Sequence, residues 1–175
     1  ALGEAARGRR LLLVTAHRRE SFGEPLRQIC GALRTLADND DPPIQIVYPV
    51  HPNPNVREVV VPLLSNHPHI TLTAPLSYFE LVRMLSHCAL VLTDSGGIQE
   101  EAPSLGKPVL VLRDETERPE AVEAGAARLV GPHGKAIIAE TLRLLRNRTE
   151  YEAMAATVNP FGDGHAAERI VSICR

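Results

Sequence analysis

The sequence predicts an α/β fold of the doubly wound kind, with a parallel sheet of about six strands. Six short apolar runs alternate with segments in which apolar residues return every three or four positions. Several of these runs are continuously apolar, as expected for strands of a parallel sheet that is covered by helices on both faces. The length of 175 residues suits one such domain and is too short for two. We therefore expect residues 1–175 to form a single Rossmann-like domain.

The predicted strands are Leu11–Thr15, Ile44–Tyr48, Ile70–Thr73, Leu90–Thr93, Val109–Leu112 and Arg128–Val130. Helical spacing of the apolar residues predicts helices in the segments Leu26–Leu36, Tyr78–Cys88 and Ala136–Leu145. A turn-rich stretch, Asn159–Gly164, precedes a last predicted helix, His165–Ile173. We expect this last helix to be able to dock away from the rest of the fold.

Composition narrows the class of function. The formal charge of −2 lacks the basic excess that nucleic-acid binding needs, so we expect no nucleic-acid partner. No apolar run is long enough for a membrane span, and Ala1–Arg10 does not resemble a signal peptide, so we expect a cytoplasmic protein with no membrane partner. Cys30, Cys88 and Cys174 are widely spaced among apolar residues, which predicts reduced core thiols.

In open parallel sheets, ligands bind beyond the carboxyl ends of the strands. The loops to examine are therefore those that begin at Ala16, Pro49, Ala74, Asp94 and Arg113. These loops are also the richest in polar residues.

The loop after the fourth predicted strand has the residues of an anion site. Ser95 is placed to cap a helix, and the lack of side chains at Gly96 and Gly97 lets a diphosphate approach the free amides at the helix start. Glu101 falls on the same edge of that helix as Gly97, where its carboxylate can accept ribose hydroxyls. The alternative is an ordinary turn with a helix cap, because Ser-Gly-Gly alone is a weak motif.

The loop Arg113–Glu120 follows the next predicted strand and carries two arginines, Arg113 and Arg118. They are suited to neutralising phosphate charge. The alternative is a solvated turn in which the arginines pair with neighbouring acids.

The first loop begins with His17 and lacks the Gly-x-Gly-x-x-Gly motif of dinucleotide-binding folds, so we expect no nicotinamide cofactor. His17 is either an active-site group or a histidine bonded to backbone at a strand end. In the second loop, three prolines restrict the chain around His51. The remaining histidines lack the spacing of metal ligands, so we expect no metal site.

Five segments together resemble the non-hydrolysing UDP-N-acetylglucosamine 2-epimerases. They are His17-Arg18-Arg19-Glu20, Tyr48-Pro49-Val50-His51, Thr93–Glu101, Ala102–Pro108 and Arg113–Glu120. The resemblance runs from Leu11 to the last predicted helix, yet covers only the carboxyl-terminal half of the family's protein. It implies a two-lobed glycosyltransferase-B-type architecture in which this lobe holds UDP and an amino-terminal lobe is missing. The full-length protein is then expected to be a homodimer.

The resemblance also implies roles for single residues. Ser95, Gly96 and Gly97 match the family's diphosphate loop, Glu101 its ribose ligand, Arg118 a further nucleotide-sugar contact and His17 an active-site histidine. Arg18 and His51 match positions that hold a second, activating substrate molecule in bacterial members. Leucines at Leu76 and Leu81, where some members place polar or aromatic residues near the uracil, leave base recognition undefined.

The chemistry that the resemblance implies is the interconversion of UDP-N-acetylglucosamine and UDP-N-acetylmannosamine by elimination and re-addition of UDP, without a cofactor. The acid and base at carbon 2 lie on the missing lobe, so we expect this chain alone to be inactive. Two other interpretations are the donor-binding lobe of a retaining UDP-sugar glycosyltransferase and a non-catalytic nucleotide-sugar-binding domain. The Arg-Asp-x-Thr-Glu-Arg-Pro-Glu and His-Arg-Arg-Glu strings favour the epimerase over the glycosyltransferase.

Overall fold

A computed structural model describes residues 8–174. Its strands are β1 (Arg10–Thr15), β2 (Ile44–Pro49), β3 (Ile70–Thr73), β4 (Leu90–Thr93), β5 (Val109–Val111) and β6 (Ala127–Leu129). Its helices are the 3-10 turn η1 (Arg19–Ser21) and α2 (Glu24–Ala37), α3 (Pro54–Leu64), α4 (Tyr78–His87), α5 (Gly96–Ser104), α6 (Pro119–Glu123), α7 (Gly134–Arg146), α8 (Arg148–Ala155) and α9 (Ala166–Ile173).

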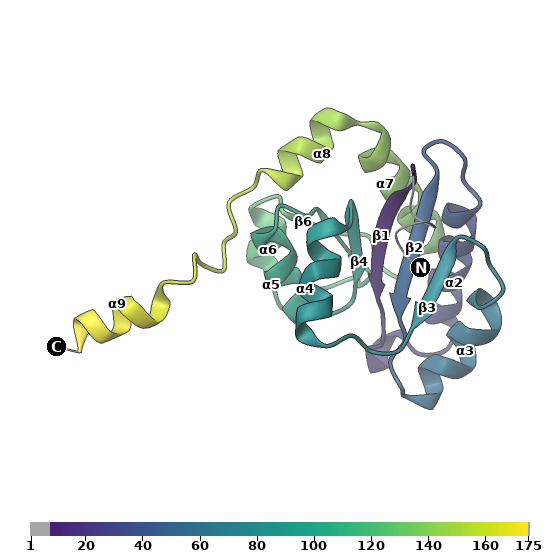
Figure 1. Cartoon of the computed structure of the whole chain (residues 1–175), viewed down its shortest axis with the longest axis horizontal. Coiled ribbons are helices and arrows are strands. Elements are labelled where there is room, and N and C mark those ends of the chain that lie inside the picture. The colour runs from purple at the N-terminus through teal and green to yellow at the C-terminus, as the bar shows by residue number, and fades with distance from the viewer. Residues whose placement is uncertain (1–7, 175) are drawn as a thin grey trace.

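The six strands form one parallel sheet in the order β3-β2-β1-β4-β5-β6 (Figure 1). This confirms the predicted fold class. From β1 at the centre, the chain adds β2 and β3 on one side of the sheet. It then returns to add β4, β5 and β6 on the other side of β1. The loops after β1 and β4 therefore lead to helices on opposite faces of the sheet, α2 and α5, and such folds bind ligands at this point of the carboxyl edge.

Two apolar cores cover the two faces of the sheet, because alternate strand residues point to opposite sides. On one face, Leu12 and Val14 of β1 pack with α2, α3, α7 and α8. On the other face, Leu13 packs with α4, α5 and α6. Strands β1, β2 and β4 are buried on both faces, which explains their continuous apolar runs.

The structure differs from the sequence prediction in its helices and in one thiol. Helices α3, α6 and α8 have no counterpart among the predicted helices. Helix α3 starts at Pro54 behind Asn53, whose side chain accepts a hydrogen bond from the Asn55 amide at 2.9 Å, and it contains Pro62. The expectation of three core thiols is wrong for Cys174. Cys30 and Cys88 are buried, but Cys174 is exposed because it directly follows α9, which packs on neither core.

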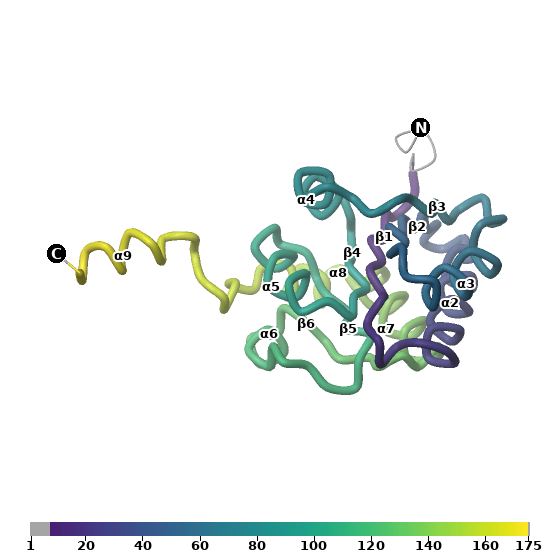
Figure 2. Tube along the Cα trace, turned by 90° about the horizontal axis from the view of Figure 1, so that it is seen from below, coloured from purple at the N-terminus to yellow at the C-terminus, as the bar shows by residue number. Residues whose placement is uncertain are grey.

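Helix α9 stands clear of the sheet at the end of an extended segment in both views (Figures 1 and 2). Its side chains are exposed, including Ile170, Val171 and Ile173. The predicted ability of this helix to lie apart from the fold matches this arrangement. Within residues 8–174, no helix combines the length and apolar character needed to cross a membrane.

Candidate functional site

The loops that follow β1 and β4 are joined at the carboxyl edge of the sheet. Thr15 and Thr93, the last residues of the two strands, are paired in the sheet, and their hydroxyls lie 2.6 Å apart in a buried hydrogen bond. The amide of Asp94 then donates to the carbonyl of Thr15 at 3.0 Å. These contacts fix the start of both loops relative to one another.

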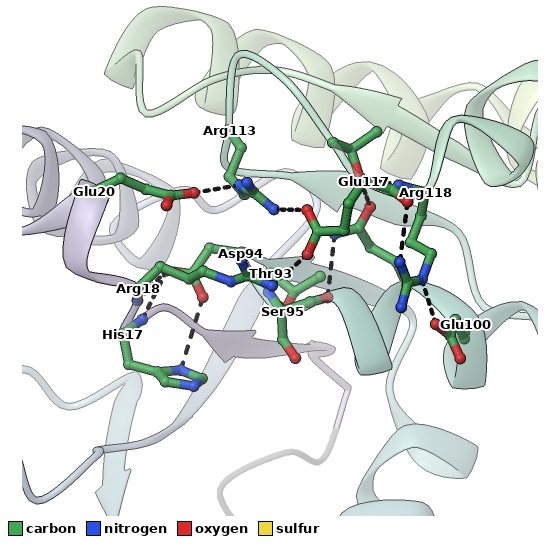
Figure 3. Close-up of polar contacts among 12 residues, drawn as sticks. His17, Arg18, Glu20, Thr93, Asp94, Ser95, Glu100, Arg113, Glu117 and Arg118 are labelled. Atoms are coloured by element: carbon green, nitrogen blue, oxygen red, sulfur yellow. Dashed lines mark hydrogen bonds and ion pairs between the residues drawn. The ribbon is translucent and has the colours of Figure 1, made fainter.

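Asp94 is the buried centre of this junction. Its side chain is wholly buried, and its Oδ2 accepts hydrogen bonds from the amides of His17 and Arg18, both at 2.8 Å (Figure 3). The same oxygen accepts a hydrogen bond from the Ser21 hydroxyl at 3.2 Å. A buried carboxylate needs such donors, because leaving it without partners is costly. The loop after β1 is therefore folded around a carboxylate from the loop after β4.

His17 lies against this centre and against His51. Its Nδ1 is 3.7 Å from Asp94 Oδ1, and its ring is stacked on that of His51 with centroids 5.0 Å apart and an interplanar angle of 2°. Burial lowers the pKa of His17; the Asp94 charge opposes this, while His51 and Arg18 add to it. The structure thus brings together the two predicted histidines, and it favours a neutral His17 imidazole.

Helix α5 begins at Gly96 directly after this junction. Ser95 occupies the N-cap position, but the expectation that its side chain caps the helix is wrong, because the hydroxyl makes no capping hydrogen bond. Its backbone amide instead donates to the Thr93 hydroxyl at 2.9 Å, and the Ser95 carbonyl receives the first helical bond, from Gln99, at 3.3 Å. The Ser95 hydroxyl and the first amides of α5 remain available to bind an anion.

The two glycines of this turn have different surroundings. A Cβ built on Gly96 would lie 2.9 Å from Oε1 of Glu117, whereas a Cβ on Gly97 would meet only Oε1 of Glu101, at 3.9 Å. The second distance confirms that Gly97 and Glu101 share one edge of the helix. The first shows that a carboxylate, that of Glu117, already lies over the start of α5, where an anion is favoured.

Glu117 belongs to a group of ion pairs that links two loops. It pairs with Arg18 from the loop after β1 and with Arg113 from its own loop, and Arg113 Nε also donates to Glu20 at 2.6 Å (Figure 3). Partial burial raises the pKa of Glu117, but hydrogen bonds from its own amide and from Arg113, with the charges of Arg113 and Arg18, lower it to about 2. Glu117 is therefore ionised at neutral pH.

Arg118 lies beside α5 and is held there by two contacts. Its Nε donates to Glu100 of α5, and an Nη atom donates to the Glu117 carbonyl at 3.0 Å. Its own amide donates to Thr116, whose hydroxyl in turn bonds to the buried Gln99 at 2.6 Å. Both arginines of this loop are thus paired with acids, as the alternative interpretation of the loop expected, and both lie near the start of α5.

Glu101 has a carboxylate oxygen, Oε2, that is buried and has no hydrogen-bond partner among residues 8–174. A carboxylate accepts hydrogen bonds only, so a buried oxygen without a donor raises the free energy of the folded state. Ligand hydroxyls would remove that cost. This is the chemistry that the sequence assigned to Glu101.

Sequence reasoning assigned no role to Asp94 and Glu117. The signal for Asp94 was present, since it directly follows a buried strand and precedes the Ser-Gly-Gly turn. The signal for Glu117 was not, because its loop contains three other acids. Within the described part of the chain, no group of three or more His, Cys, Asp or Glu side chains is arranged to hold a metal ion.

A cavity of about 750 Å³ lies away from these residues, between α4, α8 and the start of β1. Leu76 and Arg83 are among the residues that line it, and none of the predicted site residues does. Leu81 packs on the second apolar core. The loop junction at β1 and β4 is the better candidate site, because its polar groups converge.

Comparison with known proteins shows the family of the chain. The family described as UDP-N-acetylglucosamine 2-epimerase matches residues 2–175. The chain belongs to this family. The epimerase of Campylobacter jejuni is 54% identical over 165 residues, and that of Escherichia coli K12 is 55% identical over 163 residues. These alignments cover 94% and 93% of the chain, and 43% of each relative, so the chain spans less than half the length of these relatives.

Solved structures of epimerases have the same fold. The Neisseria meningitidis UDP-GlcNAc 2-epimerase, bound to UDP-GlcNAc, matches with a TM-score of 0.90 and 43% identity over 99% of the chain and 48% of that protein. The S. aureus MnaA structure with UDP matches with a TM-score of 0.90 and 43% identity over 96% of the chain and 46% of that protein. A trehalose-phosphate synthase from Burkholderia vietnamiensis, at 13% identity and a TM-score of 0.68, shares the fold alone.

Proposed function

We propose that the chain is the UDP-binding lobe of a UDP-N-acetylglucosamine 2-epimerase, forming a single Rossmann-like domain. The proposal rests on two features of the short helix α5. Its first two residues, Gly96 and Gly97, have no side chains of their own to block their amides, and Glu101, one turn further, has a buried carboxylate oxygen without a hydrogen-bond partner among the described residues. A nucleoside diphosphate matches both features, since it offers an anion and, one helical turn further, ribose hydroxyls. The relatives crystallised with UDP-GlcNAc and UDP support the choice of nucleotide.

In this proposal the diphosphate lies over the start of α5, bound by the amides of Gly96 and Gly97 and the Ser95 hydroxyl. It displaces the Glu117 carboxylate from that place. Arg118, which lies one turn along α5 beside Glu100, supplies a further positive charge. Fixed donors of this kind stabilise the negative charge that develops on UDP as it leaves carbon 1 of the sugar.

The proposed reaction interconverts UDP-N-acetylglucosamine and UDP-N-acetylmannosamine. Loss of UDP from carbon 1 gives the ring positive character, which makes the carbon 2 proton removable and leaves 2-acetamidoglucal and UDP. After a proton returns to the other face of carbon 2, UDP adds back. His17, at the same edge of the sheet, faces this chemistry, while the groups that move the carbon 2 proton belong to an amino-terminal lobe.

That lobe is the proposed partner of this chain. The exposed apolar side chains of α9 support the proposal, because a helix with such a face is stable when it packs against another surface. We propose further that the two lobes form a cytoplasmic enzyme that dimerises with a second copy and binds neither nucleic acid nor membranes. The net charge of −2 agrees with the absence of a nucleic-acid partner.

Arg18 and His51 form the proposed site for a second, activating molecule of substrate. His51 stacks on His17 and Arg18 pairs with Glu117, so both contact groups of the proposed catalytic site. A ligand that binds Arg18 would compete with Glu117 for it. This gives the second site a direct physical link to the diphosphate loop.

The test is an assay of UDP-N-acetylglucosamine epimerisation in D2O, followed by NMR at carbon 2. The chain alone should give no deuterium incorporation, and the chain combined with the amino-terminal half of a relative should give it. A chain carrying Glu101→Ala, combined in the same way, is the matched control and should be slower. Epimerisation by the purified chain alone would contradict the proposal.

A further inference from the structure

The two carboxylate oxygens of Asp94 have unequal partners. Oδ2 accepts three hydrogen bonds, from the amides of His17 and Arg18 and from the Ser21 hydroxyl. Oδ1 is buried and has no hydrogen-bond partner among residues 8–174, and the polar atom facing it is Nδ1 of His17, at 3.7 Å. The side chain is therefore anchored through one oxygen and directs the other toward the imidazole.

We propose that Asp94 is a positioning residue that keeps the proton of neutral His17 on Nδ1 and so presents an unprotonated Nε2 to the bound ligand. The role of His17 toward a ligand rests on the proposed function, because His17 acts on the UDP-sugar only if the nucleotide binds here. The tautomer itself is a property of the ligand-free chain.

The geometry favours this tautomer for a physical reason. A carboxylate oxygen can only accept a hydrogen bond, so Oδ1 gains a partner only if Nδ1 carries the proton. The observed separation of 3.7 Å is an ion-pair distance, and a hydrogen bond forms between the two atoms only when the ring moves closer to Oδ1. With an unprotonated Nδ1, a lone pair would face a buried carboxylate oxygen, and both acceptors would lack a donor.

The surroundings of the His17 ring leave Nε2 accessible to a ligand. It makes no hydrogen bond to the described residues, and the His17 side chain is 38% exposed. The charged or titratable groups that act on the ring are Asp94 from the loop after β4, His51 from the loop after β2 and Arg18 from its own loop. When Nε2 takes up a proton, Asp94 stabilises the imidazolium, which can then donate to a diphosphate oxygen. Aspartate plays the same part for histidine in serine hydrolases.

The experiment is ¹⁵N NMR of the ligand-free chain with labelled histidine, using two-bond ¹H–¹⁵N correlations to identify the protonated nitrogen. A His17→Gln variant assigns the signal. At a pH where His17 is neutral, the expected result is the Nδ1–H form. Dominance of the Nε2–H form in the unsubstituted chain overturns the proposal, and this measurement needs no variant that has to fold.

Asp94→Asn sharpens the test. The three donors that bond to Oδ2, two backbone amides and the Ser21 hydroxyl, need an acceptor, so the side-chain oxygen of the asparagine should take the place of Oδ2. The side-chain nitrogen of the asparagine then takes the place of Oδ1 and donates a hydrogen bond to Nδ1 of His17. The tautomer should then invert to Nε2–H, and the pKa of His17 should fall because the opposing charge is gone. Ser21→Ala is the matched control, since it removes a donor to Oδ2 and should leave the tautomer unchanged. An Asp94→Asn chain that folds and keeps the Nδ1–H form contradicts the inference.

These results are separable from the proposed function. If UDP fails to bind the chain, the proposed function fails, whereas the tautomer measurement keeps its meaning. If UDP binds and His17 is found in the Nε2–H form, only the proposed role of Asp94 fails.

Discussion

Two carboxylates hold the loop that carries His17 and Arg18, and they do so in different ways. Asp94 is wholly buried and is bonded by two backbone amides and a short hydroxyl side chain. Glu117 is 35% exposed and is bonded by the long side chains of Arg18 and Arg113. Backbone amides cannot move without refolding the loop, whereas arginine side chains can change partner. From this comparison we expect Asp94 to fix the shape of the site and Glu117 to give up its place when a ligand binds.

The largest expected difference between them is in folding stability. Asp94→Ala leaves buried donors without an acceptor and should lower the free energy of unfolding by about 3 kcal/mol. Glu117→Ala, the matched variant, should lower it by less than about 1 kcal/mol, because exposed ion pairs contribute little. Urea unfolding at neutral pH measures both. If the two substitutions lowered the free energy of unfolding equally, the distinction between Asp94 and Glu117 would not hold.

Gly96 and Gly97 test where the exchanged anion lies. Gly96→Ala places a methyl group where the Glu117 carboxylate lies, within 2.9 Å, and should weaken UDP binding about tenfold, or about 1.4 kcal/mol. Gly97→Ala meets only Glu101, at 3.9 Å, and should weaken it less. Calorimetric titration compares the two. A stronger effect at Gly97 would place the diphosphate elsewhere on α5.

Glu117→Gln should tighten UDP binding about threefold, because the diphosphate no longer has to displace a negative charge from the start of α5. Glu115→Gln, in the same loop and exposed, is the control and should change the affinity little. The measurement is the same titration at low and high salt. Weaker UDP binding by Glu117→Gln would mean that the carboxylate supports the site and is not displaced from it.

The smallest expected effect is in acid stability. The pKa of Glu117 is lowered to about 2 in the folded chain, so its ionised form stabilises the fold above the pKa of the unfolded chain, about 4.3. This contribution should be lost as the pH falls from about 4.3 through 2. Unfolding curves of the natural chain and Glu117→Gln should therefore converge across that range. If the difference in stability between the two chains stayed constant over this pH range, Glu117 would not have the lowered pKa that its ion pairs require.

The fold was predictable from sequence because both faces of the sheet are covered, and this leaves continuous apolar runs that periodicity detects. The positions of Ser95, Gly96, Gly97 and Glu101 followed from the rule that loops at the carboxyl ends of parallel strands meet. Cys174 was misassigned because apolar neighbours in α9 face outward here. The sequence pattern does not distinguish an apolar face that packs on its own sheet from one that packs elsewhere.

The partners of the charged residues were not predictable. Arg18 and Glu117 are far apart in the chain, and their pairing depends on how the loops after β1 and β5 lie in three dimensions. The direction of a serine hydroxyl at a helix start is also a matter of local torsion angles, which is why capping by Ser95 was expected and is not found. The unequal oxygens of Asp94 are visible only once the His17 loop is folded around it.

The central claim is that the junction of the β1 and β4 loops binds a uridine diphosphate, and calorimetric titration of this chain tests it most directly. Three charge-assisted hydrogen bonds at about 1.5 to 3 kcal/mol each, less association costs, predict a dissociation constant between about 10 μM and 1 mM for UDP. UDP should bind more tightly than UMP and ADP, and its binding should weaken in both Ser95→Ala and Glu101→Ala. A folded chain that shows no binding at millimolar UDP, or that binds UMP equally well, would contradict the account.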